Sequence, residues 1–166
     1  MKKSILTLAV FISFMANAQE LPKNFNELVK NIEPQLIGWR HHFHEFPELS
    51  NREFNTGKYI ADYLRTIGLE VKHPFAKTGV VAILKGNKPG PVIGLRADID
   101  ALPVTERAPI AFASKVKADY NGQQVNVMHA CGHDAHTAIL MATAKALKDM
   151  QKDLAGTVVF LFQPAE

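Results

Sequence analysis

The feature that most constrains the fold of this 166-residue chain is the apolar run TVVFLF at residues 157–162. Such a run, with almost no polar residue alternating in it, is typical of a β-strand that is buried on both faces. A strand of that kind needs neighbouring strands on both sides and a covering layer on both faces. The run therefore predicts a central sheet in which this segment is an interior strand.

Three other segments carry apolar residues at helical spacing. Residues 24–46 form the first, and Pro34 is expected to break this helix or to begin a second one. Residues 52–67 form the next, and Gly68 follows at the place where a glycine commonly ends a helix. Residues 134–150 form the last, shortly before TVVFLF.

Three β-rich runs, LEVKH, VVAILKG and PVIGLRADI, lie between the second and third helical segments. The turn residues NKPG join the second run to the third, so these two are expected to form a hairpin. The pair Asn121-Gly122 predicts another hairpin further along the chain. This order of helices and strands predicts one α/β domain with a mixed sheet over residues 19–166.

The first 18 residues, MKKSILTLAVFISFMANA, have the layout of a secretory signal peptide. Two lysines precede an apolar run, which closes on the small-x-small sequence that ends at Ala18. An uncleaved anchor or a buried N-terminal helix is the alternative, but a membrane span needs about 20 apolar residues. We therefore expect cleavage near Ala18, export to the periplasm or the medium, and no stable membrane span.

The charge of the chain gives little indication of a partner. The net charge is +3, with 19 basic and 16 acidic residues. Two of the basic residues and none of the acidic ones lie in the first 18 positions, so the remaining chain is nearly neutral. It has no stripe of basic residues interleaved with aromatic ones, and we expect no nucleic-acid partner.

The stretch HACGHDAH, residues 129–136, contains the only cysteine of the chain and three of its seven histidines. A lone cysteine in an exported protein is a buried inert thiol, an intermolecular cross-link or a group in chemical use. In an extended segment Cys131 and His133 would lie on the same side, and a thiolate with an imidazole suits zinc or another late divalent metal. Asp134 or Thr137 is expected to cap or charge-balance the N-terminus of the helix that follows.

Acidic residues follow two predicted strands. Asp98 and Asp100, in GLRADIDALP, lie at the end of one apolar strand, and Glu166, in FQPAE, follows TVVFLF in the same way. Ligands of open α/β sheets bind at the carboxyl ends of strands. The alternative is that these are solvated acids of ordinary loops. His41 and His44, in HHFHEFPELS, share a helix face, which we interpret as structural because one face supplies too few ligands for a metal.

Taken in order, HHFHEFPELS, GLRADIDALP, MHACGHDAHTA and FQPAE resemble the sequence blocks of the M20 metallopeptidases. The resemblance is greatest to the amidohydrolase branch, which contains N-acyl-amino-acid, hippurate and auxin-conjugate hydrolases. It covers essentially all of residues 19–166. It implies an aminopeptidase-like, zinc-exopeptidase-type α/β fold, and a lid or dimerisation domain that is not in this sequence.

The resemblance also implies a set of functional residues and two bound divalent metal ions, zinc or manganese first, with cobalt or nickel as alternatives. Cys131 and His133 match metal ligands, Glu166 matches the general base, and Asp100 matches an acid near the metals that orients a ligand or the base. Four further residues are expected to support the centre: Asp98, His129, Asp134 and His136.

The implied reaction is hydrolysis of the amide bond of N-acyl amino acids, or of short peptide-like substrates, by a metal-activated water. In the family a second glutamate and two later histidines complete the metal ligands, and none of them is in this sequence. We therefore expect the N-terminal part of such an enzyme, with a homodimer formed only by the full-length protein. The alternatives are an inactive metal-binding remnant and, last, an α/β binding domain with incidental histidines.

Overall fold

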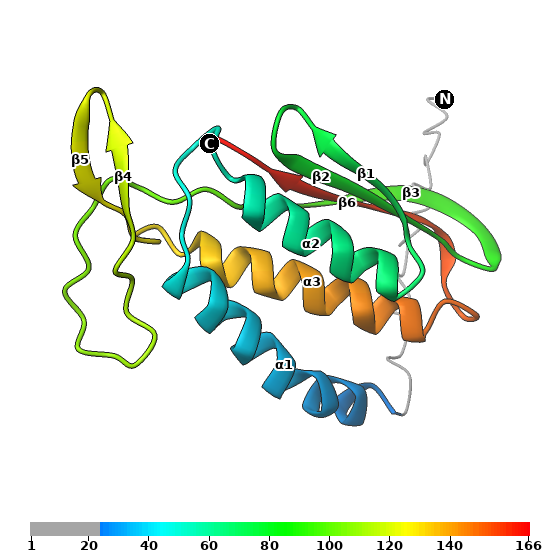
Figure 1. Cartoon of the computed structure of the whole chain (residues 1–166). Helices are drawn as coiled ribbons and strands as arrows, with labels where there is room; N and C mark the ends of the chain where they lie inside the picture. The colour runs from blue at the N-terminus through cyan, green and yellow to red at the C-terminus, as the bar shows by residue number, and fades with distance from the viewer. Residues whose placement is uncertain (1–23) are drawn as a thin grey trace, which may run out of the picture.

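The computed structural model describes residues 24–166, so the predicted signal peptide lies outside the described residues. A mixed sheet of four strands carries three helices on one of its faces (Figure 1). The helices are α1 (Phe25–Glu45), α2 (Phe54–Thr66) and α3 (His133–Asp149). The strands of the sheet are β1 (Glu70–Phe75), β2 (Gly79–Lys85), β3 (Lys88–Asp98) and β6 (Ala155–Gln163). A separate hairpin consists of β4 (Lys117–Tyr120) and β5 (Gln123–Asn126).

The apolar run TVVFLF forms the larger part of β6, and its predicted interior position is confirmed. The strand order is β1-β2-β6-β3, with β6 antiparallel to β2 and parallel to β3. Val158, Phe160 and Phe162 face the helices and are buried, whereas Leu161, on the other face, is 36% exposed. The expected cover on both faces is thus found on one face only within residues 24–166, because all three helices pack on the same side.

The predicted hairpin of VVAILKG and PVIGLRADI is wrong, because β6 lies between β2 and β3. The residues at and next to NKPG instead contact the N-terminal end of β6. The Gly86 and Lys88 amides donate to the carbonyls of Gly156 and Leu154, at 2.8 and 3.2 Å. Gly156 has a φ of 86°, and a Cβ there would lie 2.0 Å from the Pro91 carbonyl oxygen. β6 thus supplies the backbone partners of both β2 and β3, and the two strands do not pair directly.

Two hairpins join neighbouring strands in the structure. β1 pairs with β2 through a turn in which Ala76 and Lys77 have positive φ. β4 pairs with β5 through Asn121 and Gly122, with φ values of 53° and 77°, as their turn chemistry predicts.

Helix α1 is continuous through Pro34, so the expected break is absent from it. Pro34 lies on the exposed face, where the carbonyl that it leaves without an amide partner is open to water.

The hydrophobic core fills the layer between the sheet and the helices. α2 packs on β1 and β2, α3 packs on β3 and β6, and α1 packs on the outer side of α3 (Figure 1). The largest fully buried apolar side chains of the core come from the helices, from the sheet and from the segment after β3: Phe43, Ile60, Leu64, Leu84, Ile99, Met141, Phe160 and Phe162. This packing fixes α3 against β3 and β6, and so sets the N-terminus of α3 beside the carboxyl ends of both strands. None of the helices described from residue 24 onward is long and apolar enough to cross a membrane.

Two neighbouring residues of β6 test this arrangement. Phe160 is 0% exposed and faces the helices, so Phe160→Ala is expected to lower the free energy of unfolding by about 3 to 5 kcal/mol. Leu161→Ala is the matched control on the opposite face, and we expect it to cost less than about 1.5 kcal/mol. Chemical denaturation measures both values. Equal losses for the two variants would contradict the one-sided core.

Candidate active site

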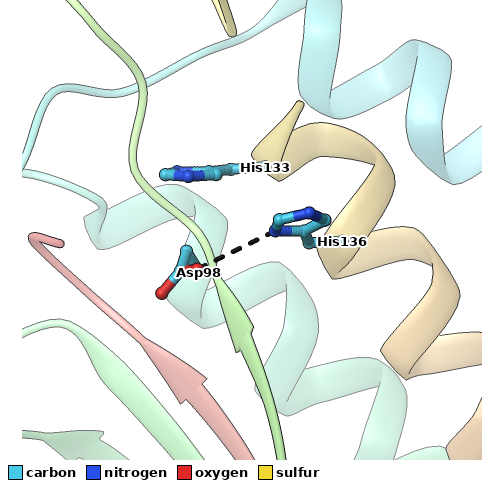
Figure 2. A group of neighbouring side chains, drawn as sticks. All are labelled: Asp98, His133 and His136. Carbon is cyan, nitrogen blue, oxygen red and sulfur yellow. Dashed lines mark ion pairs between the residues drawn. The ribbon is translucent and has the colours of Figure 1, made fainter. Parts of the chain in front are cut away.

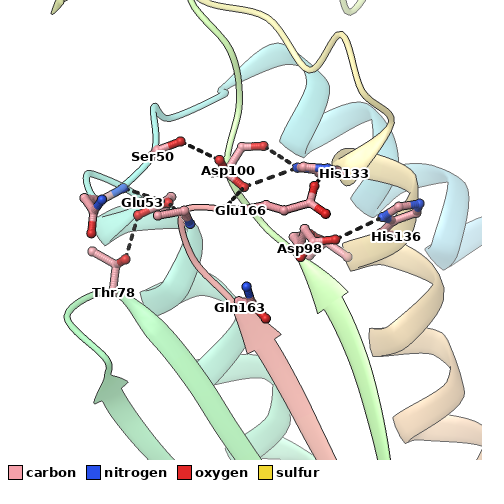
Figure 3. A network of polar contacts seen from close by, with 12 residues as sticks. Ser50, Glu53, Thr78, Asp98, Asp100, His133, His136, Gln163 and Glu166 are labelled. Atoms are coloured by element: carbon pink, nitrogen blue, oxygen red, sulfur yellow. Dashed lines mark hydrogen bonds and ion pairs between the residues drawn. The ribbon is translucent and has the colours of Figure 1, made fainter.

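The carboxyl ends of β3 and β6 form the edge at which the predicted site residues gather (Figure 3). The two strands are parallel neighbours, and their register places Asp98 opposite Gln163. Asp100 and Glu166 follow these two strands, and His133 begins α3 beside them. The structure thus brings Asp98, Asp100 and Glu166 together at one strand-end edge, where the sequence had left solvated loop acids as the alternative.

Asp98, His133 and His136 form a cluster that can hold a metal ion (Figure 2). One candidate ligand atom from each of them lies within 4.8 Å of the other two. Asp98 and His133 are buried, whereas His136 is exposed. The His136 Nδ1 lies 3.8 Å from the Asp98 Oδ2, and the two imidazole rings stack with centroids 5.5 Å apart. One carboxylate and two imidazoles are a donor set that suits a divalent metal.

The hydrogen bonds of His133 determine which of its nitrogens is free. Its Nδ1 lies 2.9 Å from the Asp100 carbonyl oxygen and 3.2 Å from the Asp100 Oδ1, so Nδ1 carries a proton and donates it. Its Nε2 lies 3.1 Å from the Glu166 Oε2. In the neutral ring these are two acceptors that face each other, and a proton or a cation is needed between them. The arrangement thus fits a bound cation.

Asp100 connects three separate segments of the chain. Its carboxylate is buried, and its Oδ2 accepts a hydrogen bond from the Ser50 hydroxyl at 2.5 Å. Its Oδ1 lies 3.5 Å from the donating Glu166 amide nitrogen and 3.2 Å from the His133 Nδ1. Asp100 therefore holds the loop before α2, the segment after β6 and the first residue of α3 in one place.

Arg96 brings a positive charge to the same edge. Its Nη2 lies 2.5 Å from the Asp98 Oδ1 and 3.8 Å from the Glu166 Oε1. Its Nε donates to the Gln163 side-chain oxygen at 2.5 Å. The guanidinium thus lies between two carboxylates that would otherwise repel each other. Sequence reasoning missed Arg96, although its two-residue spacing from Asp98 in a strand places both side chains on one face.

Cys131 is exposed in the turn before α3, which excludes the buried inert thiol. It is not part of the cluster of Asp98, His133 and His136. The extended geometry expected for this stretch is wrong, because Gly132 is left-handed with a φ of 85° and α3 starts at the next residue. This turn removes the simple alternation that would place Cys131 and His133 on one side. A ligand role for Cys131 stays a prediction.

Asp134 and His44 form a buried polar contact behind the cluster. The Asp134 Oδ2 lies 2.9 Å from the His44 Nδ1 and accepts a hydrogen bond from the Arg40 Nε at 3.3 Å. The other His44 nitrogen lies 2.6 Å from the Glu106 Oε2. His44 therefore ties α1 to α3 and to the loop after β3, which agrees with a structural interpretation of this histidine.

His129 is buried next to these groups, at 5% exposure. Within residues 24–166, neither of its ring nitrogens has a hydrogen-bond partner. Burial lowers the pKa of His129 from 6.5 to about 4, and the nearby Asp134 carboxylate only partly opposes this shift. His129 is thus a neutral ring near pH 7, and its expected supporting role stays a prediction.

Fold and cluster together define an α/β domain with a candidate metal centre at the carboxyl edge of its sheet. Solved structures of this class are similar to it over most of its described length. A dinuclear metal-binding peptidase of the M20 family from Bacillus subtilis has a TM-score of 0.74 and 47% identity, over 82% of this chain and 36% of that one. A structure from methicillin-resistant Staphylococcus aureus has a TM-score of 0.79 and 39% identity, over 88% of this chain and 36% of that one.

The sequence comparisons agree with the structural ones. Residues 94–166 match the model of peptidase family M20/M25/M40. The N-acetyl-L-cysteine deacetylase of B. subtilis is 46% identical over 138 residues, 83% of this chain and 31% of that protein. The N-acyl-L-amino acid amidohydrolase of Geobacillus stearothermophilus is 43% identical over 145 residues, 87% of this chain and 37% of that protein.

The chain belongs to the M20 family of peptidases and amidohydrolases. Its mixed sheet and flanking helices match part of the M20 catalytic domain, so the predicted fold class is confirmed. The chain spans about a third of the length of the curated relatives that it matches.

The lowered pKa of His129 predicts how stability depends on pH. The unfolded chain binds a proton at His129 near pH 6.5, whereas the folded chain does so only near pH 4. The free energy of unfolding of metal-free protein is therefore expected to fall by about 3 kcal/mol at this residue as pH drops through that window. NMR titration of the His129 ring protons measures the folded pKa. A midpoint near 6.5 would contradict the burial.

Proposed function

We propose that the natural gene product, meaning the protein as its gene encodes it, is a metal-dependent amidohydrolase. It would release amino acids from N-acyl amino acids or short peptide-like amides. The observation that carries this proposal is the short distance between the His133 Nε2 and the Glu166 Oε2, 3.1 Å, beside the Asp98 carboxylate. A free imidazole nitrogen and a carboxylate directed at one point are what a hydrolytic metal centre needs. The relatives named as deacetylase and amidohydrolase support the substrate class.

We further propose that the centre takes two divalent ions, zinc or manganese first, with cobalt or nickel as alternatives. His133 would hold an ion through Nε2, and the Cys131 thiolate would be a second ligand. Asp98 and His136 each place a candidate ligand atom within 4.8 Å of one on His133. When bound, the ions would lower the pKa of a water molecule and polarise the scissile carbonyl. The dinuclear centre named for the B. subtilis structure supports the number of ions.

Side chains of the described residues would transfer the proton and orient the reacting groups. The Glu166 carboxylate would accept a proton from the attacking water and return it to the departing amine nitrogen. The Arg96 guanidinium, 3.8 Å from the Glu166 Oε1, would restrain that carboxylate. The Asp100 carbonyl and carboxylate fix the His133 ring by its Nδ1, which keeps Nε2 directed into the site.

A metal-binding protein without catalytic activity is the second candidate. The cluster of Asp98, His133 and His136 supplies three donors, which are enough to hold one ion with a coordination position left open. The two candidates differ in turnover and agree in metal binding, so an activity assay separates them. For either one we propose export, because residues 1–18 have the layout of a signal peptide.

Removal of the proposed general base tests the reaction. The natural gene product is expected to release free amino acid from N-acetyl or N-benzoyl amino acids, and a chelator should stop the release. Glu166→Gln is expected to lower kcat by about 10² to 10⁴-fold, because the amide cannot accept the proton. Glu45→Gln, at an exposed residue of α1, is the control and should leave kcat unchanged. Chelator-insensitive turnover, or full activity of Glu166→Gln, would contradict the proposal.

Metal affinity tests the proposed ligands separately from turnover. His133→Ala and Cys131→Ala are each expected to weaken zinc binding by at least about tenfold, because each removes one donor. His41→Ala, which removes a ring that stacks on Phe112, is the matched control. Competition with a chromophoric chelator gives the affinities. Unchanged affinity of Cys131→Ala would remove that thiol from the ligand set.

A further inference from the structure

The side chain of Glu53 is completely buried, at 0% exposure, which is unusual for a carboxylate. Three donors satisfy it. The Thr78 hydroxyl donates to its Oε2 at 2.6 Å, and the amides of Asn51 and Ala165 donate to its Oε1 at 2.9 and 3.0 Å. Glu53 also stands directly before α2, where the positive end of the helix dipole favours a negative charge. The carboxylate is therefore a fixed point between two segments that are far apart in sequence.

The two amides that share the Glu53 Oε1 belong to residues in the left-handed backbone conformation. Asn51 has a φ of 63° and Ala165 has a φ of 54°; asparagine adopts this region more readily than most residues, whereas alanine rarely does. Alanine has no side-chain polar group that could stabilise this conformation locally. A hydrogen bond to a buried carboxylate holds each of these turns in place.

A sequence neighbour of each of these two residues donates a hydrogen bond to the Asp100 carboxylate. Ser50, next to Asn51, donates to the Asp100 Oδ2 at 2.5 Å. Glu166, next to Ala165, donates its amide to the Asp100 Oδ1 at 3.5 Å and places its own carboxylate 3.1 Å from the His133 Nε2. Figure 3 shows Glu53 on one side of this network and His133 on the other.

We propose that Glu53 is a positioning residue for the active site, which sets the orientation of Glu166 and Asp100 by holding the turns at Ala165 and Asn51. This inference rests on the proposed function for its catalytic consequence. Glu53 itself does not reach the cluster of Asp98, His133 and His136. Its effect passes through the backbone of the two turns.

Amide hydrogen exchange tests the hydrogen bonds from the Asn51 and Ala165 amides to Glu53, without any assay of activity. In the natural gene product, Glu53→Ala is expected to accelerate hydrogen exchange at the amides of Asn51 and Ala165 by at least about tenfold, because both lose their acceptor. Glu53→Gln should keep exchange slow, since its amide oxygen can accept both bonds while its NH₂ group donates to the Thr78 hydroxyl. Unchanged exchange in Glu53→Ala would overturn the proposal.

A double-mutant cycle tests the catalytic consequence. Glu53→Ala is expected to lower kcat by about 100-fold with KM within twofold, which is the loss that a misplacement of about 1 Å causes. Added to Glu166→Gln, it should lower kcat by less than threefold further, because the group that it positions is already inactive. Glu53→Gln should restore kcat to within about threefold of the natural protein. A full 100-fold further loss in the double variant would overturn the proposal.

Glu48→Ala is the matched control for a purely structural effect. The Glu48 carboxylate accepts from the backbone amides and side chains of Asn55 and Thr56 at the start of α2. Its loss should lower stability with kcat unchanged, and a kcat loss equal to that of Glu53→Ala would overturn the proposal. If Glu53→Ala does not fold, Glu53→Asp replaces it, since the shorter side chain cannot reach both turns. Absence of turnover in the natural gene product would contradict the proposed function, while the exchange experiment would still decide the role of Glu53.

Discussion

The parallel pairing of β6 with β3 is the interaction on which the rest of the structure depends. It places the carboxyl ends of the two strands side by side, with Asp98 opposite Gln163, so that the segments following both strands emerge at one edge. The buried face of β6 packs on α3, and this packing brings His133 to the same edge. Asp98 shares a face with Gln163, opposite the buried side chains of β6, and a slip of one residue in this register would place it on the face of Phe162 instead.

Charge at this edge is balanced by one group from the same strand and by others from distant parts of the chain. The carboxylates of Asp98, Asp100 and Glu166 lie close together, and such a group needs compensating positive charge or hydrogen-bond donors. Arg96 supplies a guanidinium, and Ser50 supplies a hydroxyl. The facing pair of the His133 Nε2 and the Glu166 Oε2 is the point where a cation fits the existing groups. The same atoms therefore account for both the electrostatic balance and the proposed chemistry.

Much of the fold could be predicted from the sequence, because its strongest signals are local. The apolar run of β6, the helical periodicity of α2 and α3, and the Asn121-Gly122 turn each gave the right element. The pairing of β2 with β3 was predicted wrongly, since turn chemistry at NKPG says nothing about a strand from 70 residues further along that inserts between them. Asp98, Asp100 and Glu166 were recognised as acids that follow strands, but solvated loop acids stayed the alternative until the structure showed them at one edge.

The contacts behind the site could not be predicted in this way. Glu53 and Ala165 are 112 positions apart, and Ser50 and Asp100 are 50 apart, so no local pattern connects them. The extended geometry expected for Cys131 and His133 failed because a single left-handed residue, Gly132, turns the chain between them. Site residues that follow strands were thus accessible to sequence reasoning, whereas residues that hold them from other segments required the structure.

X-ray absorption at the zinc edge shows whether a metal ion binds at the His133 Nε2. For the zinc-loaded natural gene product we expect imidazole nitrogen scattering at about 2.0 to 2.1 Å, which decreases in His133→Ala. A sulfur contribution at about 2.3 Å would additionally show that Cys131 is a ligand. A spectrum without imidazole scattering, or one that His133→Ala leaves unchanged, would contradict metal binding at His133.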